Sequence, residues 1–283
     1  MELEEKAQII CDLFKQNKPF LIGRNGTIEI EALDKYLNNI PITFLDKHLL
    51  ELNAGIFPEN LFEDYFINYM EALKNVDIMA EGWYERLKHV EKKILNDLNP
   101  NRSKVLFRNL EPYYVKADLR WTQYLDGKRV AIINAFAETC ESQTYISKAI
   151  WLEDSESLLP SNTIWVPITT YFSPKLAGGV AEWPPNIKSW KDAVKYTVER
   201  VLNEGCEIAV IGCGGLGMII GHELKKKGLQ CIVMGGAIQI LFGIKGGRWK
   251  SHEISNFFNR SWVSPPDTCK PRNSKYIENN CYW

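Results

Sequence analysis

The chain alternates short apolar stretches with longer amphipathic ones, and this alternation most constrains its fold. The short stretches are about five residues long and apolar throughout, which is typical of strands covered on both faces of a sheet. The longer stretches carry apolar residues at helical spacing. Strands that alternate with helices indicate a doubly wound, mostly parallel α/β sheet of the Rossmann-like kind. The predicted strands are 20–22, 76–80, 104–107, 129–133, 163–167, 207–211 and 230–234.

The remaining segments predict how the chain is organised around this sheet. Residues 44–99 are expected to form a mostly helical insertion, because Phe62, Phe66 and Tyr69 recur at helical spacing. Residues 1–264 are expected to form one α/β domain, and 265–283 a polar tail at the surface, since few apolar residues occur there. The other predicted helices are 3–15, 28–37, 137–151, 190–203 and 216–227.

Composition argues against several classes of protein. The 34 basic and 35 acidic residues leave a net charge of −1, so broad attraction to nucleic acid or to an anionic membrane is not expected. The seven cysteines contain no CxxC pair, which favours free thiols in a reducing compartment. Residues 1–8 lack the apolar core of a signal peptide, and the longest apolar stretch, 208–221, is too short to span a bilayer. We therefore expect a cytoplasmic protein with no membrane span.

A glycine pattern, Gly-Cys-Gly-Gly-Leu-Gly at residues 212–217, lies between a predicted strand and a predicted helix. Glycines allow a tight turn and close approach to a phosphate, which the N–H groups of a helix N-terminus bind. An NAD site would also need an acidic residue at the end of the next strand, where residues 234–237 read Met-Gly-Gly-Ala. NAD, a phosphate of another kind and a purely structural turn all remain open for this motif. Its candidate phosphate-binding residues are Gly212, Gly214, Gly215 and Gly217.

The next strand also ends in glycines, at Gly235 and Gly236. The carboxyl ends of neighbouring parallel strands line one crevice, where ligands of open α/β sheets bind. Gln239 is a candidate contact to a base or a sugar hydroxyl there, or a polar residue at a helix start. Lys245 and Arg248 could clamp a diphosphate with a point charge and a planar fork, or lie in a solvated loop.

A third glycine turn follows the first predicted strand. Glu29, just inside the helix that follows this turn, is a candidate general base or metal ligand. Glu138, near a helix start after the strand at 129–133, is a second candidate base, although polar residues also occur at helix starts as caps. The candidate phosphate-binding residues of the turn are Gly23, Arg24, Asn25, Gly26 and Thr27.

Several of these segments together resemble a known family. Residues 19–29, Pro-Phe-Leu-Ile-Gly-Arg-Asn-Gly-Thr-Ile-Glu, resemble the start of bacterial glycosyltransferases of the GT-D fold, which carry an Arg-x-Gly-Asp-x-Glu turn after their first strand. Residues 208–244 are similar to the C-terminal βαβ unit of that family. A group of proteins found beside sugar-modifying genes is more similar still. The segments shared with that group are 110–114, 127–130, 136–139, 142–143, 235–236, 241–246 and 248–249.

The resemblance implies a glycosyltransferase that moves a sugar from a nucleotide-sugar donor to a glycan or another hydroxyl acceptor. The family holds Mn²⁺ or Mg²⁺ on the diphosphate through an Asp-x-Glu motif, of which Glu29 matches the Glu and Thr27 stands at the Asp. Thr is a poor ligand for hard cations, so Arg24 and the cations at 245–249 are candidates to balance the charge instead. The alternatives are an NAD-dependent Rossmann oxidoreductase and a non-catalytic module that binds nucleotides or carbohydrates.

Overall fold

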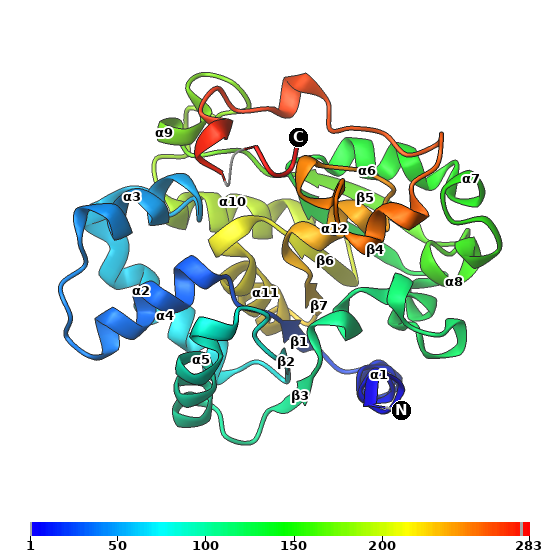
Figure 1. Cartoon of the computed structure of the whole chain (residues 1–283), viewed down its shortest axis with the longest axis horizontal. Coiled ribbons are helices and arrows are strands. Elements are labelled where there is room, and N and C mark those ends of the chain that lie inside the picture. Colours follow the sequence, from blue (N-terminus) through cyan, green and yellow to red (C-terminus); the bar gives the residue numbers. More distant parts are fainter. Residues whose placement is uncertain (1, 278–279) are drawn as a thin grey trace.

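The computed structural model, which describes residues 2–277 and 280–283, contains a seven-stranded sheet (Figure 1). Neighbouring strands are parallel throughout, in the order β3-β2-β1-β7-β6-β4-β5. This confirms the predicted α/β class with a doubly wound parallel sheet. The strands are β1 (Phe20–Gly23), β2 (Ile78–Ala80), β3 (Ser103–Val105), β4 (Arg129–Asn134), β5 (Ile164–Thr169), β6 (Ile208–Gly212) and β7 (Gln230–Val233).

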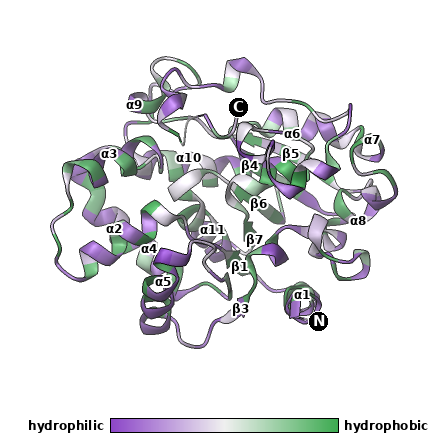
Figure 2. Cartoon of the chain, viewed as in Figure 1, coloured by the Kyte–Doolittle hydropathy of each residue, from purple (hydrophilic) through white to green (hydrophobic). Residues whose placement is uncertain are grey.

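Helices cover both faces of the sheet, and each face has its own hydrophobic core. Successive residues of a strand point to opposite faces. Ile133 therefore belongs to the core that includes α2 to α5, α10 and α11, and Ile132 to the core that includes α1, α6 to α8 and α12. Figure 2 shows the apolar strands between these layers, and the strongly hydrophilic α5 at the periphery. The helices are α1 (Glu2–Lys15), α2 (Thr27–Leu37), α3 (Phe44–Leu52), α4 (Phe62–Lys74), α5 (Glu85–Leu98), α6 (Ala137–Thr144), α7 (Ser147–Trp151), α8 (Ser155–Leu158), α9 (Pro174–Ala177), α10 (Trp190–Asn203), α11 (Gly217–Lys226) and α12 (Ile238–Leu241).

The helix boundaries follow local capping chemistry. The predicted helix 190–203 is confirmed as α10, and the Ser189 side chain caps it by accepting a hydrogen bond from the Asp192 N–H. The single helix predicted over 137–151 is wrong, because the chain forms α6 and then α7. The N–H of Ile146 donates to the carbonyl of Gln143, three residues back, and this tighter turn ends α6.

Residues 44–99, expected as a helical insertion, are part of the sheet's own connections. The segment contains β2 together with α3, α4 and α5. Helices α2 to α4 carry the chain from β1 to β2, and α5 carries it from β2 to β3. All four helices contribute to the same hydrophobic core as α10 and α11. The sequence therefore predicted that this region is largely helical, but it did not predict that these helices connect neighbouring strands of the sheet.

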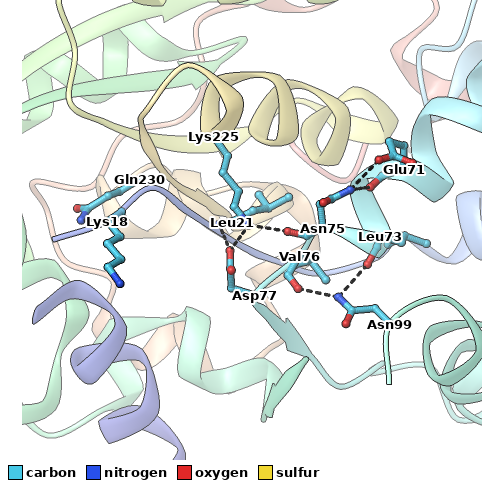
Figure 3. Close-up of polar contacts among 10 residues, drawn as sticks. All are labelled: Lys18, Leu21, Glu71, Leu73, Asn75, Val76, Asp77, Asn99, Lys225 and Gln230. Atoms are coloured by element: carbon cyan, nitrogen blue, oxygen red, sulfur yellow. Dashed lines mark hydrogen bonds and ion pairs between the residues drawn. The ribbon is translucent and has the colours of Figure 1, made fainter. Parts of the chain in front are cut away.

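The amino edge of the sheet is held by a polar cluster around Asp77 (Figure 3). The Asp77 carboxylate accepts a hydrogen bond from the Leu21 N–H at 2.7 Å and forms an ion pair with the Lys225 ammonium at 2.7 Å. Lys225 also donates to the carbonyl of Asn75 at 2.7 Å. These contacts tie β1, the start of β2 and the last turn of α11 together at the edge opposite the one where ligands of parallel sheets bind.

Residues 265–283, expected as a polar tail at the surface, pack into the fold. Among the described residues of this segment, Ser274, Ile277 and Cys281 are buried. The carbonyl of Cys281 accepts a hydrogen bond from the Arg248 N–H at 2.9 Å. In Figure 1 the orange-to-red segment crosses the top of the view near α9 and above the strand ends. The apolar anchors are too few and too widely spaced to form a periodic pattern, which is why the sequence indicates a tail.

None of the helices in the described part of the chain has both the length and the apolar character that a bilayer span requires. All seven cysteines are free, and five of them are buried. Cys140, Cys206 and Cys231 lie inside the two cores, where their thiols act as small apolar side chains.

Candidate functional site

At two places in the sheet, two neighbouring strands are followed by helices that lie on opposite faces. After β4 the chain runs to α6 on one face, and after the adjacent β6 it runs to α11 on the other. After β1 and the adjacent β7 it runs to α2 and α12, again on opposite faces. Open α/β sheets bind ligands where adjacent connections diverge in this way. A cavity lies at each of these two points.

The larger of these two cavities, which we call the apolar pocket, lies beyond the ends of β4, β5 and β6. Polar groups enter its wall from Asn53, Asn134 and Thr170. Ligand sites commonly combine an apolar wall with a few such polar groups. The aromatic side chains that line it include Phe136, Tyr171, Phe172, Trp183, Tyr196 and Trp283.

The second cavity, which we call the arginine pocket, lies beyond the ends of β1 and β7. Arg24, Glu29 and Arg248 provide the charged groups among the described residues of its wall. The two pockets are neighbours, since both are lined by the same five residues. These shared residues are Asn53, Gly214, Gly236, Ile277 and Tyr282.

Most of the predicted site residues meet at these two pockets. Those that line the arginine pocket are Arg24, Gly26, Thr27, Glu29, Gly214, Gly215, Gly235, Gly236 and Arg248. Those that line the apolar pocket are Gly212, Gly214, Gly236 and Gln239. The walls of neither pocket include Gly23, Asn25, Glu138, Gly217 and Lys245. The strand-end turns of β1, β6 and β7 therefore converge, as the sequence indicates, while individual residues within them do not all face a cavity.

Arg24 is held on the β1 side of the arginine pocket. Its guanidinium lies 5.0 Å from the ring centroid of Phe107 and donates to the carbonyl of Asn25 at 3.1 Å. Gly235, at φ +62°, makes room for it, because a Cβ there would lie 2.9 Å from Nη1 of Arg24. The guanidinium is therefore packed against the glycine turn after β7.

Arg248 is held on the other side by the C-terminal segment. Its guanidinium lies 5.1 Å from the ring centroid of Tyr282 and 5.7 Å from that of Trp249. Nη2 also contacts the sulfur of Cys281 at 3.4 Å. Stacking on aromatic rings keeps such a fork oriented, and a fork suits the paired oxygens of a phosphate. Two oriented guanidiniums thus enter one cavity.

Glu29 folds back over the N-terminus of α2. It is 8% exposed, and a Cβ on Gly26 would lie 1.9 Å from its Oε2 atom. The free N–H groups and partial positive charge of a helix N-terminus favour a carboxylate there. Burial, with the negative charge of Glu29 adding to it, raises the pKa of Tyr65 and of Tyr69 well above the usual phenol range. Both phenols therefore stay protonated beside this carboxylate.

The donor set of the arginine pocket fits an anion better than a divalent cation. Glu29 is the one carboxylate that the described residues contribute to its wall, against two guanidiniums. No group of three or more His, Cys, Asp or Glu side chains suited to a metal occurs in residues 2–277 and 280–283. Hard cations bind several oxygen ligands, usually including carboxylates. Among the described residues, Glu29 is thus the one carboxylate of this wall that could serve the predicted Mn²⁺ or Mg²⁺ site.

Asn25, a predicted phosphate contact, is engaged in the interior instead. It is 6% exposed, its amide donates to Oε1 of Glu91 at 2.7 Å, and its amide oxygen accepts from the Tyr69 hydroxyl at 2.7 Å. Burial raises the pKa of Glu91. Asn25 thus joins the turn after β1 to α4 and α5, and its amide is satisfied without a ligand.

The Gly-x-Gly-x-x-Gly motif serves close packing of the chain. Gly214 has φ +60°, and the N–H of Gly215 donates to the carbonyl of Ala54 at 2.9 Å. A Cβ on Gly212 would lie 2.5 Å from the carbonyl oxygen of Gly235, and one on Gly217 would lie 3.1 Å from Val233. A pyrophosphate bound in the Rossmann manner would lie against the glycine turn, where the loop at Ala54 packs instead. The structural turn, among the alternatives for this motif, is the use observed here.

The remaining predicted residues also have structural partners or lie elsewhere. Gln239 is 1% exposed, and its amide donates to the carbonyl of Ile244 at 3.2 Å. Gly23 packs against Met218, whose sulfur would lie 2.3 Å from a Cβ. Glu138 is exposed on α6, outside both pockets, which removes its support as a base. Lys245 is half-buried and also lies outside both pockets, so the predicted clamp retains Arg248 without Lys245.

Sequence reasoning missed Asn53, and it did not predict the raised pKa of Glu111, which lies outside both pockets. Asn53 lies where the two pockets join, and its side-chain amide makes no hydrogen bond to the described part of the chain. Burial raises the pKa of Glu111 to about 7, although its hydrogen bond from the Tyr113 hydroxyl (3.2 Å) and the charge of Arg108 lower it. Glu111 lies in the shared segment 110–114, so the resemblance contained a signal for it. Asn53 follows a helix with no turn motif to mark it.

Comparison of this chain with protein-family models, with curated proteins and with solved structures gives no match.

Proposed function

We propose that this protein is a glycosyltransferase that uses a nucleotide-sugar donor. One observation carries the proposal: Arg24 and Arg248 present two oriented guanidiniums to a single cavity at the carboxyl edge of the sheet. Guanidinium forks pair with phosphate oxygens, so the diphosphate of the donor is assigned to this cavity. The resemblance of residues 19–29 and 208–244 to GT-D glycosyltransferases supports the same assignment.

The neighbouring apolar pocket accounts for the nucleoside. Its aromatic side chains suit a flat base, and its wall continues into the arginine pocket through Asn53, Gly214 and Gly236. The Asn53 amide makes no side-chain hydrogen bond within the described residues and would bind a ribose hydroxyl or a phosphate oxygen between the two pockets. The donor then extends from the base, past the diphosphate, toward Glu29.

The chemistry follows from these positions. An oxygen of the acceptor hydroxyl forms a bond to the anomeric carbon of the sugar, and the bond from that carbon to the diphosphate oxygen breaks. The electron pair leaves with the nucleoside diphosphate, whose growing charge the two guanidiniums stabilise. Glu29 takes the proton that the hydroxyl loses. No step is assigned to a metal, because the described residues give the pocket wall a single carboxylate.

Binding of nucleotides to Arg24→Ala and Arg248→Ala variants tests the assignment. Calorimetry and thermal shift would use UDP, GDP, dTDP, CMP and NAD, each with and without manganese. Loss of one charge-assisted hydrogen-bond partner costs about 1.5–3 kcal/mol, so we expect about a tenfold or greater loss of affinity for the nucleoside diphosphate that binds. Arg129→Ala, at the exposed start of β4, is the matched control and should leave this affinity unchanged.

Two results would contradict the proposal. Equal affinity of the wild type and both pocket variants for nucleoside diphosphates would place the diphosphate elsewhere. Stabilisation by NAD alone would favour the oxidoreductase, despite the glycine turn that Ala54 covers.

A further inference from the structure

Trp83 stands apart from the other tryptophans of this protein. All nine lie among the described residues, and the other eight are buried or half-buried, whereas Trp83 is 49% exposed. It lies in the connection from β2 to α5, at the carboxyl edge of the sheet. An indole left in water loses the gain of burying one of the largest apolar side chains. Its exposure beside the candidate site therefore points to a ligand that covers it.

The backbone on the N-terminal side of Trp83 is anchored to its surroundings. The N–H of Glu81 donates to the carbonyl of Val105 at 2.8 Å. Gly82 lies so close to α5 that a Cβ there would fall 1.8 Å from Oε2 of the buried Glu91. The absence of a side chain at this position lets the loop pack against α5. The indole is thus presented from a loop whose approach is fixed by β3 and α5.

Trp83 belongs to the wall of the arginine pocket together with Arg24, Thr27 and Glu29. A flat apolar surface therefore faces the same cavity as a guanidinium, a hydroxyl and a carboxylate. A pyranose ring has the matching chemistry, with C–H groups on one face and hydroxyls around its edge. A nucleobase also stacks on an indole, but the aromatic apolar pocket offers a base a larger and less polar site.

We propose that Trp83 is the stacking platform for the pyranose ring of the donor, and that Glu29 and Thr27 contact the hydroxyls of that ring. This inference rests on the glycosyltransferase function proposed above and adds the sugar subsite to it. The donor then runs from the apolar pocket, across Arg248 and Arg24, to Trp83 at the mouth of the arginine pocket. Trp83 contributes to the affinity for the sugar and not to the affinity for the nucleoside diphosphate.

The test compares each nucleoside diphosphate with its sugar conjugate on the full chain. The calorimetric pairs are UDP with UDP-glucose, GDP with GDP-mannose, and dTDP with dTDP-glucose. For the pair that binds, we expect the conjugate to bind more tightly than the bare diphosphate. Trp83→Ala should lower the affinity for the conjugate about fivefold, as loss of one aromatic stack would. The affinity for the bare diphosphate should stay unchanged. Trp83→Phe should retain most of the conjugate's affinity.

Tyr84→Ala provides the matched control. Tyr84 is the next residue, is 40% exposed, and its ring centroid lies 5.7 Å from that of Trp83. It is absent from the wall of the arginine pocket and lines a smaller adjoining cavity instead. Its removal should leave both affinities unchanged, which separates stacking from a general disturbance of the loop.

The outcomes distinguish this inference from the proposed function. An unchanged conjugate affinity in Trp83→Ala overturns the sugar subsite and leaves the transferase intact, provided the diphosphate still binds. An equal loss for the conjugate and the bare diphosphate also overturns it, because the base or the diphosphate would then contact the indole. Failure of every pair to bind the wild type overturns the proposed function itself, and the sugar subsite with it.

Discussion

At the scale of single residues, Glu29 carries the sharpest prediction. It is the carboxylate of the arginine pocket, buried over the first turn of α2. Glu29→Gln keeps the shape of the side chain and removes its capacity to accept a proton. We expect the rate of sugar transfer to fall by about 10²-fold or more, as for loss of a general base, while the affinity for the nucleoside diphosphate changes little. Single-turnover assays and calorimetry measure the two quantities.

Glu138→Gln is the control for that substitution. Sequence reasoning names Glu138 as a second candidate base, but the side chain is exposed on α6 outside both pockets. Its substitution should leave both transfer and binding unchanged. A loss of transfer in Glu138→Gln with normal transfer in Glu29→Gln would reverse the assignment. Nucleotide binding by the wild type with no transfer to any acceptor would favour the non-catalytic module.

Glu111 gives a prediction about pH. Burial raises its pKa from the usual value of 4.5 to about 7. Between these two values the folded chain binds a proton that the unfolded chain has released, so the free energy of unfolding decreases as the pH rises through this range. Gln does not ionise and removes this effect. We expect Glu111→Gln to gain about 2 kcal/mol relative to the wild type between pH 5 and pH 8.

Urea denaturation of both proteins at the two pH values measures this difference. The surface variant Glu138→Gln should show a change of less than about 0.5 kcal/mol over the same range. A relative gain in Glu111→Gln that is the same at pH 5 and pH 8 would show that Glu111 does not titrate in this window.

At the scale of elements, sequence-based prediction is most accurate where a cap or an apolar segment determines the bounds of a helix or strand. Helix α10 begins after a Ser cap and ends as predicted, and all seven strands were placed within a few residues. The segment 137–151 failed because its polar composition gives helical propensity without an apolar face to hold one straight helix. The segment 44–99 shows helical periodicity, but the position of β2 at the sheet depends on pairing with β1 and β3, which no local pattern records.

The polar cluster at Asp77 ties three elements together and carries a stability prediction. Asp77→Ala leaves the Leu21 N–H and the Lys225 ammonium without this acceptor. We expect the free energy of unfolding to fall by about 1–3 kcal/mol, with no effect on nucleotide affinity, because the cluster lies at the edge of the sheet opposite the pockets. Chemical denaturation and calorimetry measure both.

Asp12→Ala is the surface control for that variant. Asp12 forms an exposed ion pair with Lys15 at 3.0 Å on α1. Such pairs contribute about 0–1 kcal/mol. A similar loss of stability in both variants would mean that the Asp77 cluster contributes no more than a surface ion pair.

At the scale of the whole molecule, the sequence could predict that the turns at the strand ends converge. It could not predict the other residues that line the two pockets. The carboxyl ends of parallel strands share one edge, so the glycine turns at 212–217 and 235–236 were expected to line one crevice. The loop at Ala54 and Tyr282 in the C-terminal segment reach the pockets through tertiary packing alone. The glycine motif at 212–217 consequently resembles a phosphate-binding turn in sequence, while its third residue, Gly214, and its fourth, Gly215, pack against that loop.

The pairing of β1 with β7 has a consequence for how the protein folds. The arginine pocket draws one wall from near the start of the chain and another from near its end, because residues 20–22 pair with 230–232. Closing so long a loop is among the slower steps of folding, since its entropy is lost before the contact forms. Partly folded forms that lack this pairing have no arginine pocket. A ligand of that pocket therefore binds only after β1 has paired with β7. Because the ligand stabilises the paired form, it slows proteolysis of the chain.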